Sequence, residues 1–443
     1  MAKSIFDLPE FKPLRRRWES RSALCARRQS YYDGSIYRQV ATQLGWLAPR
    51  VYGGIRPLFL PLARAVDVDA GIVPGGWAWE ADTPDKIRMA RETLFDWSDW
   101  DTEGVLFVHY GAVFGMSGLK VVDLREQGKV LLLPVSPQMF MLVEAGQYDN
   151  TPALALWLEF REAGDQIVEY AEVIEPERVR TFIDGEPMGV DGREAEYRNE
   201  LGFVPFVECY HMRTGRKVGE PTFEKAIPLL DEVNGLASYL ADIIKKHAEP
   251  QWAIFGAEPS ELTHSGDNVW FIPGPGDAKI LVPSIDIEGV LKFVEAIRAN
   301  VHGALPELAF DDLRSKDQIA TETVKLQLIE LILKIQRVRP NYDAALLAGL
   351  RMAGRAGRSL GLTALAVLDD PGLALDNERP VLPVSRIEEI RLAEAELALE
   401  MQQQIAEGGG LTASAGGPVR GPKGTPEMGM RNAEVGMGSE DGE

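Results

Sequence analysis

The sequence predicts a mixed α+β protein in which β-rich and helical regions are separate. Three amphipathic helical patterns lie in the second half of the chain, over residues 226–249, 286–303 and about 318–339. Between residues 104 and 210, short apolar runs alternate with Gly, Asp and Asn, which is typical of antiparallel hairpins. Strands followed by helices, rather than strict alternation, favour the α+β class.

The N-terminal part is predicted to contain helices before the strands begin. A basic helix ends near Tyr31-Tyr32-Asp33-Gly34, where glycine favours a turn, and a second helical pattern covers residues 84–100. The strand pattern then opens at Val105–Val108. The basic helix carries a cluster of six arginines, Arg15, Arg16, Arg17, Arg21, Arg27 and Arg28. A solvated or inter-subunit helix face explains this cluster more simply than contact with nucleic acid does.

The helices at 226–249 and 286–303 each carry one apolar stripe and bracket a β-rich insert. Such helices tend to pack as an antiparallel pair with the insert at the far tip. Within the insert, Pro273–Asp277 is predicted to be a hairpin turn. It lacks the Lys and Ser/Thr of a phosphate-binding loop, and its prolines remove the backbone donors that such a loop needs.

A charged loop and a long helix follow the second stripe. The loop covers 304–318, and Pro340 is expected to end or kink the helix after it. A further helix is predicted near 385–406. The Gly-, Pro-, Ser- and Met-rich remainder, 407–443, is expected to be disordered.

The formal net charge of −20 excludes an overall basic surface that grips DNA through its phosphates. An acidic channel wall would instead let DNA slide, although increased solubility is the simpler explanation of the charge. No apolar run approaches the roughly 20 residues of a membrane-spanning helix, and the N-terminus has no signal core. Cys25 and Cys209 are expected to be reduced, buried thiols.

The sequence contains no pattern that indicates catalysis. There is no Gly-x-Ser-x-Gly or His-Glu-x-x-His motif, and the histidines lack metal-ligand spacing. Lone His109 and His211 are expected to be packed or surface histidines. We therefore expect no catalytic residue, cofactor or metal, and a protein that is not an enzyme.

The order of these features resembles the portal proteins of tailed bacteriophages, particularly those of the siphovirus type. Local sequence adds to the resemblance: Tyr31-Tyr32-x-Gly34 follows a basic helix, Leu119–Pro137 forms a strand–turn–strand–Pro unit, and Asn199–Pro205 precedes a strand. Ile227–Asn234 opens the first striped helix. The resemblance spans about residues 20–405, although Lys316-Asp-Gln-Ile-Ala-Thr stands where the family commonly has a Ser-Gly pair.

The resemblance implies a portal fold with a β-rich and helical wing, a two-helix stem, a small α/β clip, a long tunnel-flanking helix and a helical crown. It divides the chain into a wing over 1–225, stem helices at 226–249 and 286–303, a clip at 250–285 and a tunnel loop at 304–318. A long kinked helix and a return to the wing follow over 319–384, then the crown at 385–406 and the disordered tail at 407–443.

The resemblance further implies a ring, usually a dodecamer, at one capsid vertex of the virion, with assembly in the host cytoplasm. Double-stranded DNA would pass through its channel during packaging and ejection. The implied partners are further copies of the chain, the major capsid protein, terminase and then head-completion adaptor or tail proteins, with no membrane contact and no cofactor.

Three groups of residues are candidates for contacts in such a ring. The clip candidates for partner contact are His264, Trp270 and Phe271, although the two aromatic residues could equally form the clip's own core. Lys245 and Lys246 are candidates for the stem channel. The tunnel-loop candidates for DNA contact are Asp311, Asp312, Arg314, Lys316 and Asp317, whose charges could instead pair between subunits.

Two other functions remain compatible with the residues alone. One is a soluble α/β metabolic enzyme with an unrecognised carboxylate site, and the other is a prophage scaffold or adaptor without a channel. The mass in solution separates them from a portal, because an enzyme of this size is typically a monomer to tetramer.

Overall fold

A computed structural model gives the architecture of the chain. It describes residues 4–37, 59–80, 83–146, 151–164, 166–190, 192–215, 218–248, 251–256, 269–272, 275–281, 287–310, 326–376 and 379–381. These residues all lie in the first of two units, which ends at Leu382. The expected helix at 385–406 and the tail at 407–443 lie outside the described residues.

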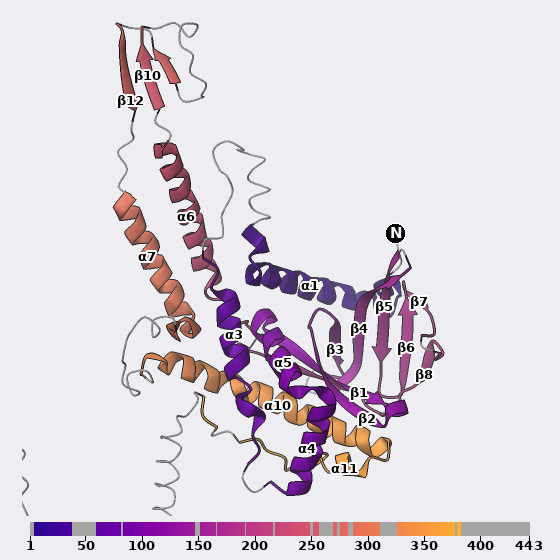
Figure 1. The fold of residues 1–443 in the computed structure, drawn as a ribbon. Coiled ribbons are helices and arrows are strands. Elements are labelled where there is room, and N and C mark those ends of the chain that lie inside the picture. The colour runs from indigo at the N-terminus through magenta and orange to yellow at the C-terminus, as the bar shows by residue number, and fades with distance from the viewer. Residues whose placement is uncertain are drawn as a thin grey trace, which may run out of the picture. The chain divides into compact units, whose positions relative to one another are not determined.

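The mixed α+β class is confirmed, and its centre is a long helix packed on a three-stranded antiparallel sheet (Figure 1). The sheet has the order β2-β1-β9, and the helix is α10, Ile329–Ser359. The strands are β1 (Met116–Leu124), β2 (Lys129–Val135) and β9 (Phe206–Tyr210). Helices α4 (Asp85–Ser98) and α5 (Trp100–Phe114) pack against β2 and β1.

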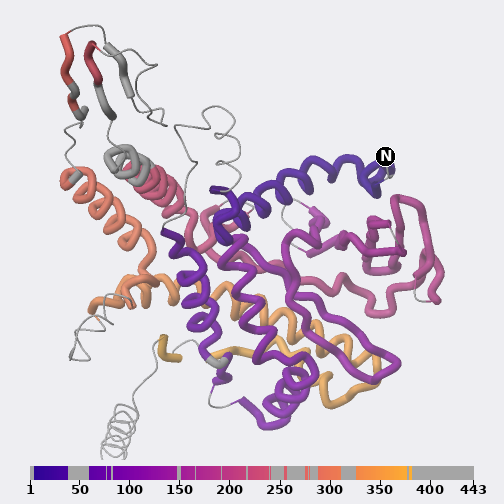
Figure 2. The backbone as a smooth tube through the Cα atoms, turned by 45° about the horizontal axis from the view of Figure 1, so that its top comes forward, coloured from indigo at the N-terminus to yellow at the C-terminus, as the bar shows by residue number. Residues whose placement is uncertain are grey.

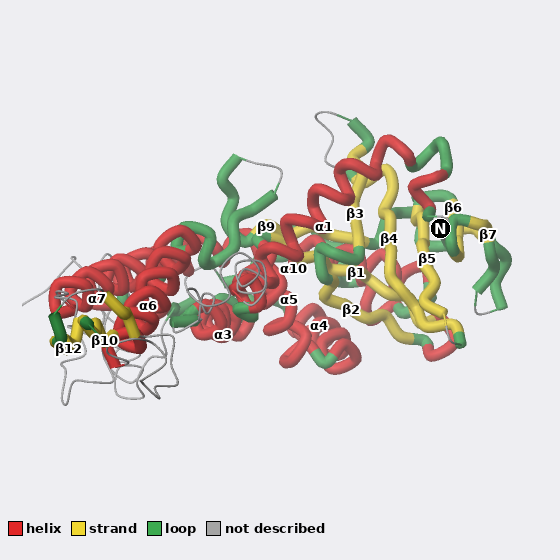
Figure 3. Tube along the Cα trace, turned by 90° about the horizontal axis from the view of Figure 1, so that it is seen from above, coloured by secondary structure: helices red, strands yellow, loops and turns green. Residues whose placement is uncertain are grey.

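The second sheet is antiparallel, with the order β3-β4-β5-β6-β7 and with β8 paired to β6. Its strands are β3 (Phe140–Glu144), β4 (Pro152–Ala163), β5 (Gln166–Ile174), β6 (Arg178–Ile183), β7 (Glu186–Pro187) and β8 (Glu196–Arg198). Helix α1, Lys12–Tyr32, runs beside this sheet (Figure 3). Phe6, Phe11 and Trp18 from the N-terminal region join Leu156 and Phe182 in one buried cluster.

Helices α6 (Ile227–Ala248) and α7 (Ile287–Ala304) pack against each other, as the two apolar stripes predicted (Figures 1 and 2). A three-stranded sheet lies between them in the chain, beyond the end of α6. It contains β10 (Gln251–Phe255), β11 (Val269–Ile272) and β12 (Asp277–Leu281), in the order β11-β10-β12. The shorter elements are α3 (Leu62–Ile72), α11 (Thr363–Ala366) and the 3-10 turns η1 (Ile5–Asp7), η2 (Gly75–Trp77), η3 (Arg125–Gln127) and η5 (Pro306–Leu308).

The strand predicted at Val105–Val108 is wrong, because these residues belong to α5. Phe107 and Val108 are fully buried, but the exposed position beside them is occupied by apolar Val105, so the helix has no polar face there to reveal its period. An apolar run this short does not separate a strand from a buried helix by periodicity alone. Gly115, with φ 78°, ends the helix in the left-handed conformation that glycine adopts without strain.

Pro340 does not end the long helix, which continues to Ser359. Long-range bonds hold the helix on both sides of the proline. Arg339 donates to the carbonyl oxygens of Ile72 and Val73, at 3.0 and 3.1 Å, and Asp343 pairs with Arg379. These contacts stabilise a helix that has lost one backbone hydrogen bond. The predicted start of this helix, 318–325, lies outside the described residues.

The predicted hairpin at Pro273–Asp277 is also wrong, because β11 and β12 lie on opposite sides of β10. Strand β10 pairs in parallel with β11 and antiparallel with β12. The segment between β11 and β12 therefore crosses from one edge of the sheet to the other. A period-two pattern predicts strands, but it does not predict which of them are neighbours.

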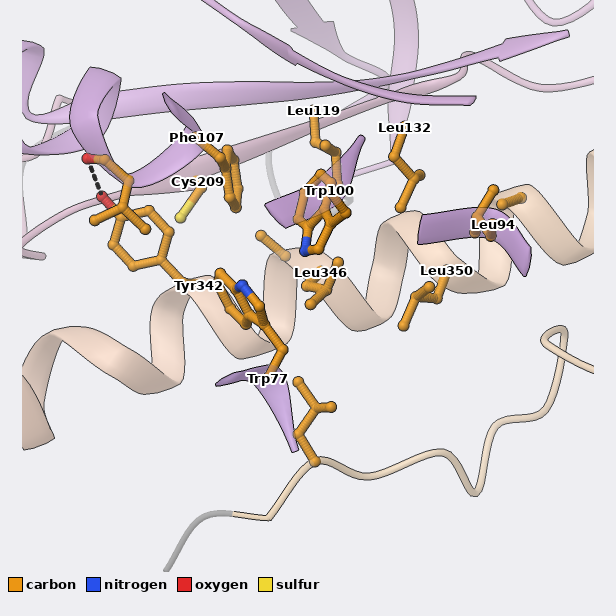
Figure 4. Packing of buried hydrophobic residues seen from close by; sticks show 14 of the residues in the cluster. Trp77, Leu94, Trp100, Phe107, Leu119, Leu132, Cys209, Tyr342, Leu346 and Leu350 are labelled. Carbon is orange, nitrogen blue, oxygen red and sulfur yellow. Dashed lines mark hydrogen bonds between the residues drawn. The ribbon is translucent and has the colours of Figure 1, made fainter. Parts of the chain in front are cut away.

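The largest apolar cluster lies around α10. Leu331, Ile335, Val338, Leu346 and Leu350 recur at steps of three, four and eight residues and are all buried. Aromatic side chains from η2 and α5 complete this cluster (Figure 4). A separate cluster seats the helix pair, where Leu230, Val233, Ile297 and Val301 of α6 and α7 join side chains of α1, α3 and α5, including Tyr31, Val66 and Val113.

Candidate functional site

Five polar side chains from separate elements meet in a buried group beside the base of the helix pair. We call this group the polar cluster. Asp69, His211 and Glu307 have no exposed surface, Thr222 is 5% exposed, and the side chain of Lys334 is 13% exposed. Asp69 comes from α3, Glu307 from η5 and Lys334 from α10, whereas His211 and Thr222 lie between β9 and α6.

Hydrogen bonds connect the members of the polar cluster in a chain. Thr222 Oγ1 donates to Asp69 Oδ2 over 2.5 Å, and His211 Nε2 lies 3.1 Å from Thr222 Oγ1. Because the threonine proton is used on Asp69, Nε2 is assigned as the protonated ring nitrogen of His211. Its Nδ1 then accepts from the Tyr342 hydroxyl at 2.9 Å.

Lys334 is the only cation in direct contact with these carboxylates among the described residues. Its Nζ lies 3.4 Å from Asp69 Oδ2, donates a hydrogen bond to Glu307 Oε1, and lies 3.4 Å from the carbonyl oxygen of Thr222. Burial alone would lower the pKa of Lys334, but Asp69 and Glu307 outweigh it and raise that pKa.

The two carboxyl groups differ in their protonation. Burial opposes ionisation of Asp69, but Lys334, His211 and Thr222 outweigh it and hold the pKa of Asp69 well below its usual range. Burial and the nearby Asp69 charge raise the pKa of Glu307 to about 8. Burial lowers the pKa of His211, which is therefore neutral at pH 7. Because Asp69, His211 and Glu307 have no solvent contact, the cluster is suited to holding segments together rather than to acting on a substrate.

The residues singled out from the sequence lie apart from this cluster. Lys245 and Lys246 lie near the end of α6, and their side chains lie outside the described part of the structure. Trp270 and Phe271 are on β11, opposite Ala253 and Ile254 of β10. Outside the described residues are His264 and the loop candidates Asp311, Asp312, Arg314, Lys316 and Asp317. Glu307 precedes these loop candidates in the chain, and Lys334 follows them.

Sequence reasoning missed the polar cluster and part of the arginine cluster. Arg21 and Arg28 are buried and bonded within the chain. Arg28 Nη1 donates to the carbonyl oxygen of Phe114 over 2.6 Å, and its Nη2 lies 2.9 Å from Glu224. The only signal in the sequence that Arg21 and Arg28 share a helix face is their spacing of seven residues.

None of the helices in the described residues is long and apolar enough to cross a bilayer. The family model "Phage portal protein, SPP1 Gp6-like" matches residues 117–351, which is more than half of the chain. The match runs from β1 into α10 and includes the helix pair and its small sheet. The chain belongs to this family. The phage portal proteins are structural components of the phage particle rather than enzymes.

Among solved structures, a chain of the "Virion of native gene transfer agent (GTA) particle" is similar to this portal-family chain. The two chains are 16% identical over 80% of this chain and 87% of the other, with a TM-score of 0.36. No curated protein matches the sequence.

Proposed function

We propose that this portal-family protein assembles into a closed ring whose channel carries double-stranded DNA into and out of the capsid at one vertex. The observation that supports this most is the α6/α7 pair, which lies inside the family match and carries a separate small sheet. In this proposal α6 and α7 are the stem, residues 250–285 are the clip, and residues 1–225 belong to the wing.

Apolar side chains left in water support assembly with further copies. On α7, Leu291 is 46% exposed and Phe293 is 53% exposed. Leu326, just before α10, and Ile329 and Leu333 at its start follow one another at three- and four-residue steps and are also exposed. Adjacent copies in a ring would cover such surfaces, which monomeric proteins rarely expose in contiguous patches.

The net charge of −20 suits a channel that does not retain DNA. Repeated copies of an acidic wall repel phosphate from every side, whereas a few cations attract it weakly. We assign the tunnel loop to 304–318, with Arg314 and Lys316 as its DNA-facing cations among Asp311, Asp312 and Asp317. Lys245 and Lys246 are assigned to the stem channel.

We assign partner docking to the clip, with His264, Trp270 and Phe271 as contacts. Terminase would dock there during packaging, and head-completion adaptor or tail proteins afterwards. The wing would face the major capsid protein. The proposed ring is a dodecamer located in the virion.

Mass photometry and negative-stain imaging of the purified chain test the ring. We expect particles with about twelve times the 48.9 kDa mass of one chain and a central hole. A monomer-to-tetramer mass without a hole would overturn the proposal and favour the enzyme or adaptor alternatives.

The DNA-facing loop is tested separately by the double variant Arg314→Ala/Lys316→Ala. We expect it to form rings and to package or retain less DNA than the unmodified chain. Arg16→Ala/Lys86→Ala removes the same two side-chain types from exposed positions on α1 and α4 and is the matched control. DNA handling that is equal in both variants would contradict the loop assignment.

A further inference from the structure

Both backbone connections of the α6/α7 pair pass through the polar cluster. Thr222 precedes the start of α6 at Ile227, and Glu307 follows the end of α7 at Ala304. The η5 turn that carries Glu307 contacts α3, α7 and α10. The entry and the exit of the helix pair are therefore attached to the same buried group.

Lys334 contacts the chain at both the entry and the exit of the helix pair. It donates a hydrogen bond to Glu307 on the exit side, contacts the carbonyl oxygen of Thr222 on the entry side, and forms an ion pair with Asp69 of α3. These contacts join the two ends of the helix pair to α3 and α10. The apolar cluster around Leu230 and Val301 also seats the pair, and beside it Tyr31 and Tyr37 donate to Asp231 of α6, at 2.9 and 3.0 Å, but these bonds reach only the first helix of the pair.

The charges of the polar cluster balance only when it holds an additional proton. Two carboxyl groups face one ammonium group, and His211 is neutral. Asp69 Oδ1 and Glu307 Oε2 are buried without a hydrogen-bond partner among the described residues. Among the residues that the structure describes, a second buried negative charge would have no cation to compensate it, which is strongly unfavourable.

We propose that the polar cluster is a proton-dependent joint that fixes the base of the α6/α7 pair to α3 and α10. While Glu307 holds the proton, the cluster is neutral and the pair is firmly attached. Loss of that proton leaves an uncompensated charge and loosens the attachment. The inference rests on the proposed function only where it calls the α6/α7 pair the stem. If the pair is the stem, the joint determines how firmly the stem is held in the wing.

Among the described groups in and beside the polar cluster, Glu307 is the one whose titration falls near pH 8. Asp69 has a lowered pKa, and those of Lys334 and Tyr342 are raised, so none of the three titrates near neutrality. The pKa of Glu307 is raised from 4.5 to about 8, so its contribution to stability is complete below pH 4.5 and disappears as the pH rises through about 8. His211, with a lowered pKa, opposes this trend only below pH 6.5.

Hydrogen exchange of the full chain between pH 6.5 and 9 tests the joint, with each rate divided by the intrinsic rate at that pH. In the first turns of α6 and the last turns of α7, opening should increase about tenfold per pH unit up to pH 8 and then level off. Glu307→Gln, which mimics the protonated acid, should keep these amides protected and abolish the pH dependence. Glu288→Gln, at an exposed residue of α7, should leave the pH dependence of these amides unchanged.

The joint is overturned if the unmodified chain shows no pH dependence at these amides, or if Glu307→Gln retains it. Lys334→Met should open the same amides at every pH, and adding Glu307→Gln should partly reverse this. The mass of each sample separates this inference from the proposed function. Rings without the pH dependence contradict the joint alone, whereas the pH dependence without rings contradicts the portal proposal alone.

Discussion

The Tyr342 hydroxyl of α10 fills the space in which Gly111 of α5 would carry a side chain. A Cβ atom at position 111 would overlap the phenol oxygen, which also bonds to His211 Nδ1 at 2.9 Å. The Tyr342 ring meets Phe107 edge to face with centroids 5.3 Å apart. The approach of α10 to α5 therefore depends on the absence of one methyl group.

Gly111→Ala should destabilise the fold by about 3 kcal/mol, because neither helix can move away without disturbing the packed core. Urea unfolding measures the change, and the loss should be smaller in a Tyr342→Phe background. Gly303→Ala on α7 is the matched control, since nothing lies within 4 Å of its Cβ position. Equal losses in the two glycine variants would contradict the packing argument.

Asp343→Asn should cost about 3–5 kcal/mol of unfolding free energy, because it leaves the buried Arg379 guanidinium without its counter-charge. Arg379 donates twice to this carboxylate, at 2.6 and 3.0 Å. Thermal or urea unfolding measures the loss. The exposed pair of Arg178 and Glu196 gives the control, and Glu196→Gln should not move the midpoint.

In a Glu307→Gln background, stability should fall as the pH drops below 6.5. Burial lowers the pKa of His211, so protonation favours the unfolded chain, and the opposing contribution of Glu307 is absent. Urea unfolding between pH 5 and 7 measures this slope, whereas in the unmodified chain the contribution of Glu307 acts in the opposite direction. Adding His211→Gln should remove the slope. If the slope persists, another group causes it.

Cys25 and Cys209 should react with a thiol reagent far more slowly in the native protein than in denaturant. Both are free and 1% exposed, and burial raises the pKa of each thiol, which leaves little reactive thiolate. Ile167→Cys, at a residue that is 71% exposed, should react at once and serves as the reference. Rapid labelling of the unmodified chain would show that these sites open readily.

The α6/α7 helix pair could be predicted because the apolar pattern that indicates each helix lies within a single segment of the sequence. Each stripe repeats within one segment, and α6 and α7 occupy the positions that the stripes predicted. For α5, by contrast, the apolar side chain of Val105 at an exposed position removed the periodic signal. The order of β10, β11 and β12 depends on contacts between segments that no single segment encodes.

The polar cluster could not be predicted because its members are far apart in the chain. Asp69 and Lys334 meet only after α3 and α10 have packed, and each is an ordinary charged residue in its local sequence. For His211, the sequence alone indicated only a packed or surface histidine. Its burial and its bonds to Thr222 and Tyr342 became visible with the fold.

Gln251 and Leu281 are cross-strand partners on β10 and β12, so the chain enters and leaves the small sheet at neighbouring points. Adjacent strands lie about 5 Å apart, a gap that a short turn can close. The segment between α6 and α7 can therefore be exchanged as a cassette, with one docking module replaced by another, while the helices that carry it keep their register.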